Sequence, residues 1–209
     1  SRRKNGSPSW SPVFPMADTP NFPDCNPVLF IDQKADLWLF WIAVLANRWE
    51  DSLLRYKKAS DYQGEGAPRW NWQDVIILKP GEDFVRDLEA GYQSMHIPEI
   101  DYGGYAPHPL EALLDASRNR SNRQKGWMTR THVTVLPSGR ILLPLYSDGF
   151  YVGLMAISDD GGALWRASSP IVGIGLNQPS VVRKKDGGLV AYMRDEGPVP
   201  KCVQVSESH

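Results

Sequence analysis

Apolar residues gather in three separate stretches of the chain, and each stretch leads through a short polar turn into a second apolar run. Two strands joined by a turn rich in Gly, Asp or Ser form a β-hairpin. A further apolar stretch follows each hairpin and predicts a third strand. The hairpin strands are predicted at residues 26–31 and 37–40, 131–136 and 141–143, and 178–182 and 189–191, with third strands at 52–58, 150–157 and 202–205.

The spacing of these units predicts a repeated sheet. The second and third hairpins begin at residues 131 and 178, about the length of one four-stranded propeller blade apart. A fourth strand is predicted at 72–78. A lone leading strand is predicted at 10–16, where Pro12 and Pro15 are typical of a sheet edge. The pattern therefore predicts an all-β protein of the β-propeller class.

Residues 80–126 lose the strand pattern and are interpreted as an irregular, partly helical insertion between blades. Phe84, Leu88 and Tyr92 are spaced for one face of a helix. Pro109 precedes a second apolar cluster and predicts a short helix with proline in its first turn. An insertion of this length either shapes a substrate site or only packs against the sheets, and the pattern leaves both alternatives open.

One turn combines four residues that each have a physical role, in the pattern S-x-D-x-G-x-x-W. Ser158 and Asp160 can hydrogen-bond the backbone amides of the turn, Gly162 permits a positive φ, and Trp165 can cover the hairpin as an apolar plug. An ordinary Asp-Gly hairpin is the simpler reading of the Asp and Gly alone. All four positions, with strands on both sides, favour a structural turn of a repeated sheet.

Composition and charge narrow the function classes. The 209 residues carry a net charge of −1, so bulk electrostatics favour neither nucleic acid nor an anionic membrane as a partner. The longest apolar run, 37–46, is too short to span a membrane. The four histidines and two cysteines show no metal-ligand spacing, and no glycine-rich phosphate loop is present. We therefore predict neither a metal site nor a cofactor.

The four-residue turn and three further phrases resemble the Asp-box (BNR-repeat) β-propellers of the sialidase superfamily, in particular the predicted-neuraminidase branch. The phrases are residues 26–30, residues 136–146, and residues 178–180 together with 193–194. The resemblance implies a six-bladed propeller, of which this chain would supply about three blades in one partial domain spanning 1–209. The blade units would be 17–79, 127–175 and 176–209, with the insertion at 80–126. It also implies a secreted or periplasmic location, although no signal peptide is recognised.

The resemblance also implies which face of the sheets carries a site. In such propellers the first strand of a blade is innermost, and substrates bind where it starts and where the second strand ends. Arg140 would lie on the opposite face, with a structural role. The residues expected on the substrate face are Asp24, Asn26, Arg130, His132, Tyr146, Asp148, Gln178, Arg194, Asp195 and Glu196.

The chemistry of the side chains on the substrate face indicates a role for several of them. Arg130 and Arg194 can grip a substrate carboxylate with a planar fork of donors, although two arginines that bridge loops to nearby Asp residues are an equally good reading. The unperturbed pKa of a histidine side chain lies near neutrality, so His132 is a candidate acid/base, although lone histidines more often serve structure. Asp195 and Tyr146 complete the catalytic candidates, and Gln178 and Asn26 the substrate-binding ones.

These residues predict a glycoside hydrolase or polysaccharide lyase that acts on an acidic glycan. The alternative is a non-catalytic glycan-binding or scaffolding propeller. Sialic acid itself is not implied, because the Arg-Ile-Pro motif of true sialidases is missing. The expected partner is a carbohydrate. A second copy of the chain is a further candidate partner, which would close the ring, and a longer gene product that supplies the other blades is the alternative to such a homodimer.

Overall fold

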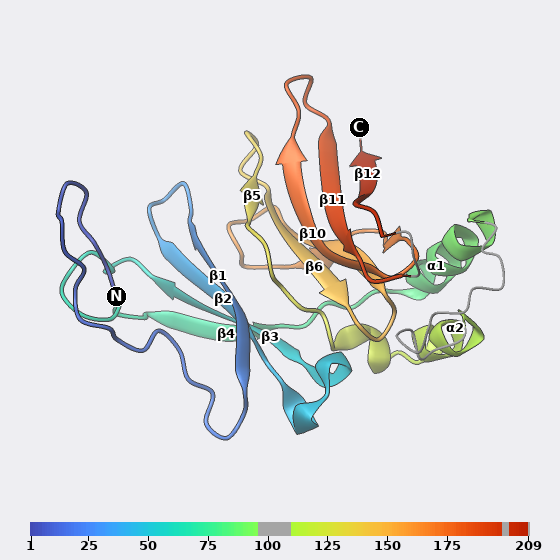
Figure 1. Cartoon of the computed structure of the whole chain (residues 1–209), viewed down its shortest axis with the longest axis horizontal. Helices are drawn as coiled ribbons and strands as arrows, with labels where there is room; N and C mark the ends of the chain where they lie inside the picture. The colour runs from blue at the N-terminus through green and yellow to red at the C-terminus, as the bar shows by residue number, and fades with distance from the viewer. Residues whose placement is uncertain (96–109, 198–200, 209) are drawn as a thin grey trace.

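A computed structural model describes residues 1–95, 110–197 and 201–208. The described chain folds into three antiparallel sheets and two helices (Figure 1). The predicted Pro109 at the start of the second helix lies outside the described residues. The fold class predicted from the repeated hairpins is confirmed, because the described chain is mostly β and its strands follow one another in repeated antiparallel sheets.

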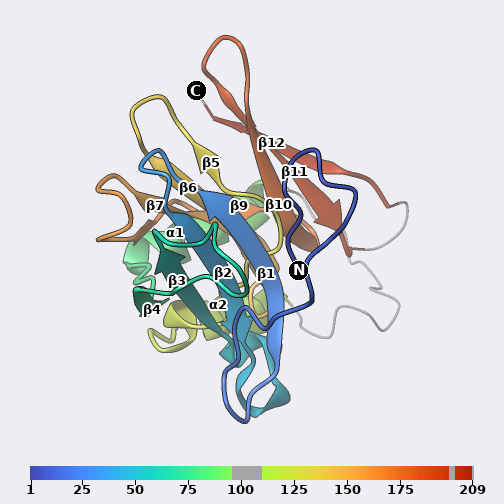
Figure 2. The ribbon, with the colours of Figure 1, turned by 90° about the vertical axis from the view of Figure 1, so that its left-hand side faces the viewer.

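The first sheet has four strands in sequence order, each antiparallel to the next. Three of them match the predicted hairpin and third strand, and the fourth matches the strand predicted at 72–78. Figure 2 looks at the molecule from the side of this sheet. Its strands are β1 (Asp24–Ile31), β2 (Leu37–Ala43), β3 (Leu53–Ala59) and β4 (Trp72–Ile76).

The second sheet has β6 and β7 at its centre, and its remaining strands are short. The two central strands are almost wholly buried, because the sheet packs against a neighbouring sheet on each face. Its strands are β5 (Thr134–Val135), β6 (Ile141–Ser147), β7 (Val152–Ser158), β8 (Arg166–Ala167) and β9 (Ile171–Val172).

The third sheet has three strands in sequence order. The hairpin predicted here forms, and the third strand begins two residues later than predicted. Its strands are β10 (Leu176–Arg183), β11 (Leu189–Asp195) and β12 (Gln204–Ser208).

The core is built between sheets. Trp38 and Phe40 of β2 pack with Leu143 and Leu154 of the second sheet in one large cluster. Met155, the neighbour of Leu154, points to the other face and joins a smaller cluster with the third sheet. Because successive strand residues face opposite sides, one strand contributes to both clusters. The second sheet is therefore held between the other two.

The insertion forms two helices as predicted, α1 (Glu82–Ser94) and α2 (Leu110–Arg118), which lie together at the right of Figure 1. The predicted face of Phe84, Leu88 and Tyr92 is buried. Short 3-10 turns, η1 (Leu45–Asn47) and η2 (Trp49–Asp51), occupy the β2–β3 loop, and η3 (Asn122–Gln124) follows α2.

The predicted strand at residues 10–16 is wrong. These residues have irregular backbone, and Trp10 and Val13 are 63% and 88% exposed. Pro12 and Pro15 lack the amide hydrogens that a strand ladder requires, so they would interrupt the ladder in the middle of the segment.

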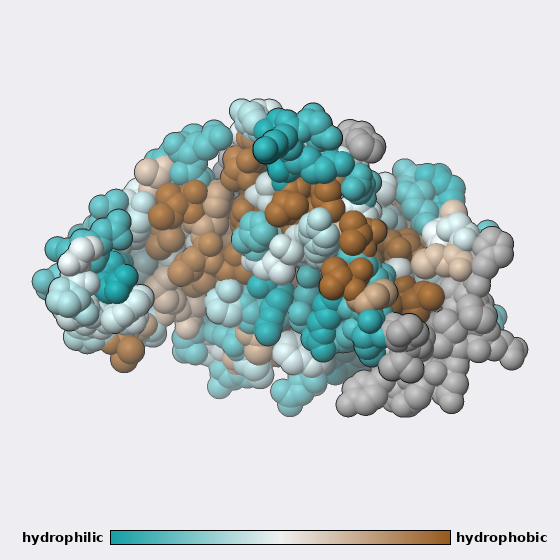
Figure 3. Space-filling model, turned by 45° about the horizontal axis from the view of Figure 1, so that its top comes forward, coloured by the Kyte–Doolittle hydropathy of each residue, from teal (hydrophilic) through white to brown (hydrophobic). Residues whose placement is uncertain are grey.

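Several apolar side chains on the outer faces of the first and third sheets are exposed. Leu29 and Ile31 of β1 are exposed, as are Val182, Tyr192 and Val205 of the third sheet. Figure 3 shows hydrophobic surface in the middle of one face of the molecule, over the region of β1 and of β10–β12. In a propeller such faces pack against the next blade.

Candidate functional site

Residues from all three sheets meet where β1 and β10 start and β6 ends. The Asn26 side chain of β1 donates from Nδ2 to the phenol oxygen of Tyr146 on β6, at 3.1 Å. Arg130 donates from Nη1 to Asn26 Oδ1 at 2.7 Å. Gln178 of β10 also hydrogen-bonds the Tyr146 phenol. The structure therefore joins four residues that the sequence places on the substrate face.

The backbone at Asn26 and Gln178 explains how two strands deliver side chains to one phenol. Both residues have a positive φ, 53° and 51°, and each precedes a proline. The register of β1 and of β10 shifts at these positions, as in a β-bulge. A non-glycine residue with positive φ is strained, and bulges redirect side chains beside functional sites. The same combination of a positive φ and a register shift therefore occurs in the first strand of two sheets.

The surroundings of Tyr146 keep its phenol protonated. Burial raises the pKa of Tyr146, and the negative charge of Asp148 raises it further, against the opposing hydrogen bonds from Gln178 and Asn26. Tyr146 is thus a neutral hydrogen-bonding group at physiological pH.

Asp148 is the most perturbed carboxyl of the site. Burial and then the negative charge of Glu196 raise its pKa from the ordinary 3.8 to about 6, and Glu50 adds to the rise. Asn177 donates from Nδ2 to Asp148 Oδ1 at 3.5 Å and, with Arg194, opposes the rise. A carboxyl that exchanges its proton near neutrality can serve as a general acid or base.

Asp148 also lines a cavity of about 560 Å³ between three segments of the chain. The β2–β3 loop supplies one side, α2 a second, and the β6–β7 loop a third. Two of its cations are already paired: Arg48 with Glu50 at 3.1 Å, and Lys125 with Asp51 at 2.5 Å. The remaining lining includes Trp49, Ala112, Leu113, Ala116, Asn122, Ser147, Gly149, Phe150 and Tyr151.

Two predicted catalytic residues contact backbone groups outside this cluster. His132 Nε2 lies 3.0 Å from the carbonyl oxygen of Val181 on β10. Asp195 accepts from the backbone amides of Gly197, at 2.7 Å, and Cys202, at 3.2 Å. These contacts give both side chains a structural task, and their catalytic roles stay predictions.

The remaining predicted residues on this face are divided between site and scaffold. Arg194 is exposed and pairs with Glu196 at 2.9 Å, on the side of Asp148. Asp24 instead accepts from Trp41 Nε1 at 2.9 Å and from the backbone amide of Thr19 at 2.7 Å.

Sequence reasoning placed Asp148 on the substrate face but gave it no role, and it did not find Glu50. No local motif marks either residue. The one available signal was the segment 146–148, in which a tyrosine and an aspartate follow the end of a buried strand.

The S-x-D-x-G-x-x-W turn lies between β7 and β8. Ser158 Oγ donates to Asp160 Oδ1 at 2.9 Å and accepts from the amide of Gly162 at 2.8 Å. Asp160 Oδ1 also accepts from the amide of Leu164 at 3.0 Å, and these bonds lower the pKa of Asp160. Trp165 closes the turn by donating from Nε1 to the Gly162 carbonyl at 3.1 Å. The turn's side chains therefore bind the turn itself.

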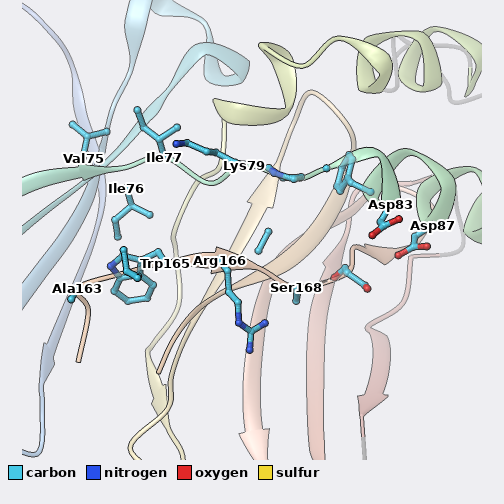
Figure 4. Close-up of a pocket in the computed structure, with 16 residues that line it drawn as sticks. Val75, Ile76, Ile77, Lys79, Asp83, Asp87, Ala163, Trp165, Arg166 and Ser168 are labelled. Carbon is cyan, nitrogen blue, oxygen red and sulfur yellow. Dashed lines mark hydrogen bonds between the residues drawn. The ribbon is translucent and has the colours of Figure 1, made fainter. Parts of the chain in front are cut away.

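A second cavity, of about 540 Å³, lies beside this turn and is lined by the end of β4, the start of α1 and residues 163–169 (Figure 4). Trp165 lies near Ile76 in this view, while Arg166 extends away from Asp83 and Asp87 of α1. Of the residues predicted for the site or the turn, only Trp165 lines it. The network around Tyr146 and Asp148 is therefore the better candidate site.

The described residues contain no group of three metal-ligating side chains placed to hold an ion. No helix within them is long and apolar enough to cross a membrane.

Solved structures define the class of fold. An endo-arabinase from Bacteroides thetaiotaomicron has a TM-score of 0.52 at 14% identity, over 95% of this chain and 61% of that one. A GH43 β-1,3-galactosidase solved with galactodeoxynojirimycin has a TM-score of 0.53 at 14% identity, over 87% and 53%. The Trypanosoma rangeli sialidase in complex with the inhibitor DANA has a TM-score of 0.52 at 13% identity, over 88% and 26%. The chain thus has the fold of part of a β-propeller and spans less than two thirds of each of these proteins.

A family model matches the second half of the chain. Residues 124–209 match the model of the BNR repeat-like domain. This partial match agrees with the resemblance of the turn and strands to the sialidase-like, BNR-repeat propellers. No curated protein sequence matches it.

Proposed function

We propose that this chain forms part of a carbohydrate-active enzyme, a glycoside hydrolase or polysaccharide lyase, in which Asp148 is the general acid/base. One observation carries the proposal: Asp148 lines a cavity, and burial and Glu196 raise its pKa to about 6. A carboxylic acid that holds its proton near neutrality can protonate a glycosidic oxygen, or exchange a proton with a sugar carbon acid.

The neighbours of Asp148 suit this chemistry. Glycoside hydrolysis ordinarily requires a second carboxylate, and Glu196 and Glu50 are the candidates. Each pairs with an arginine, Glu196 with Arg194 at 2.9 Å and Glu50 with Arg48 at 3.1 Å. The neutral phenol of Tyr146 supplies a hydrogen-bonding group for the reacting sugar.

Substrate binding would use the rest of the same face. Trp49 is 44% exposed and lines the cavity with Tyr151, so both rings offer flat faces for a sugar ring. Arg130 and Arg194 would hold a uronate or sialate carboxylate. The solved structures of similar fold include an arabinase, a galactosidase and a sialidase, and this likeness of fold supports a glycan as substrate without identifying it.

The test is turnover on a panel of acidic and neutral glycans, with products separated by chromatography. We expect Asp148→Asn to lose turnover. Asp186→Asn, an exposed carboxylate in the β10–β11 turn, is the matched control and should keep it. Full turnover by Asp148→Asn would refute the assigned role. Binding of glycans without turnover of any would instead favour the glycan-binding module, for which the exposed ring of Trp49 is the supporting observation.

A further inference from the structure

Two of the acidic residues that line the cavity, Asp148 and Glu50, are held on loops and not in strands. Asp148 lies in the β6–β7 loop, and Glu50 in the β2–β3 loop of the neighbouring sheet. The influence of Glu50 on the Asp148 carboxyl depends on how far apart these loops lie. The insertion contacts both loops.

The first contact is made by α1. Tyr92 donates from its phenol to the carbonyl oxygen of Phe150 at 3.0 Å, in a buried hydrogen bond. Phe84 packs edge-on against Phe150, with ring centroids 5.6 Å apart, and against Trp127 at 5.8 Å. Phe150 is two residues from Asp148, so α1 holds the loop that carries the acid.

The second contact is made after α2. The Gly126 amide donates to the carbonyl oxygen of Ser52 at 2.9 Å. Gly126 has φ +73°, and a Cβ there would lie 2.5 Å from the carbonyl oxygen of Glu50. The adjacent Lys125 pairs with Asp51 at 2.5 Å. The backbone of the insertion therefore lies directly against the loop that carries Glu50.

A buried arginine joins these two contacts. Arg123 is 2% exposed, and it donates to the Ser117 carbonyl of α2 at 3.0 Å and to Glu82 of α1 at 2.7 Å. Its own carbonyl accepts from Trp127 Nε1 at 2.8 Å. One side chain thus links both helices to the segment that ends at Gly126.

We propose that the insertion is a brace that sets the separation of the two cavity loops, and that Tyr92 is a positioning residue for Asp148. The brace holds Asp148 in its partly buried place and keeps Glu50 beside it. The importance of this for catalysis rests on the function proposed above, but the positioning itself can be measured without a substrate.

The measurement is the carboxyl titration of Asp148. The groups that face Asp148 are Glu50 from the β2–β3 loop, Glu196 and Arg194 from the end of β11, and Tyr146 and Tyr151 from the second sheet. Carbon-13 NMR of labelled aspartate follows the titration, and the signal lost in Asp148→Asn assigns it. If the brace loosens, water reaches the carboxyl and its midpoint falls from about 6 toward 3.8.

Tyr92→Phe removes the hydrogen bond to the β6–β7 loop. We expect the Asp148 midpoint to fall by about half a pH unit or more. Tyr56→Phe is the matched control, because it also removes a hydrogen bond of a largely buried phenol, from Trp72 Nε1 at 2.8 Å, but between β3 and β4. It should leave the midpoint in place. An unchanged midpoint in Tyr92→Phe, or an equal fall in both variants, overturns the proposal.

A glycine pair tests the second contact. Gly126→Ala should displace the Glu50 backbone and lower the Asp148 midpoint. Gly66→Ala is the control, because it introduces a Cβ at a similar φ, +75°, with no atom within 4 Å. This variant should leave the Asp148 midpoint unchanged. If Gly126→Ala fails to fold, the Tyr92 pair decides alone. A shifted midpoint in a protein that turns over no glycan would support the brace and refute the proposed enzyme.

Discussion

Asp148→Asn should make the protein more stable at pH 7. The native pKa of Asp148 is about 6, above its ordinary value of 3.8, because burial and the charge of Glu196 disfavour the carboxylate. The unfolded chain releases this proton near pH 4 and the folded chain near pH 6. An asparagine has the same shape, carries no charge, and still accepts from Asn177.

The sign follows from proton linkage. Between about pH 4 and 6 the native state binds more protons at Asp148 than the unfolded state, so its contribution to stability falls as the pH rises. The contribution is fully favourable below the unfolded pKa and fully lost above the native one. The rise of the pKa from 3.8 to about 6 corresponds to at most about 3 kcal/mol. Solvent access to this half-buried group reduces that figure, so we expect about 1–3 kcal/mol.

The assay is urea unfolding of the wild type and Asp148→Asn at unit steps from pH 4 to pH 8. Subtracting the two free energies of unfolding at each pH removes the contribution of every other titrating group that the substitution leaves unchanged. We expect the difference to be near zero at pH 4, to grow through pH 5 and 6, and to level off by pH 7. A variant that is no more stable at pH 7, or a difference that does not depend on pH, would refute the reasoning.

Three further predictions concern scaffold, recognition and assembly. Gly162→Ala should lower the free energy of unfolding, measured in urea, by about 1–3 kcal/mol, because its Cβ would lie 2.3 Å from Trp38 Cη2 at φ +90°. The control is Gly161→Ala, whose Cβ would meet only Lys34 Nζ at 3.9 Å and which should cost less. Equal losses in the two variants would contradict the packing argument. In calorimetry a uronate ligand should bind better than its reduced alcohol by about 2 kcal/mol, and Arg130→Ala should remove much of that preference. Equal affinity of the wild type for the two ligands would refute the acidic-glycan proposal. We also propose that a second copy of the chain covers the exposed apolar residues of the first and third sheets. Light scattering should then find a dimer, and a charge introduced by Tyr192→Glu should disrupt it. A well-folded monomer would rule out the dimer.

The strands and helices were predictable wherever a local period determines burial. The first and third hairpins form close to their predicted positions, because two apolar runs joined by a short polar turn mark both strands locally. The helix over Glu82–Ser94 follows in the same way from the spacing of Phe84, Leu88 and Tyr92. The strand predicted at 10–16 failed because a strand needs a partner edge, and a short apolar segment does not specify one.

The site was only partly predictable. The substrate face followed from the resemblance to propellers, which brought Asn26, Arg130, Tyr146 and Gln178 to one place in advance. Asp148 could not be singled out, because its pKa is raised by burial and by Glu196 and Glu50, which lie far from it in sequence. Electrostatic coupling depends on distance in space, and no local pattern records it.

Local sequence patterns specify the repeated antiparallel sheets, the helical insertion and the turn at residues 158–165, because each depends on hydrogen bonds and burial within a short segment. Tertiary packing was needed to bring the bulges at Asn26 and Gln178 together at Tyr146, to place the insertion against two loops, and to raise the pKa of Asp148 to about 6. These properties arise from packing between sheets, where residues more than a hundred positions apart come within hydrogen-bond distance.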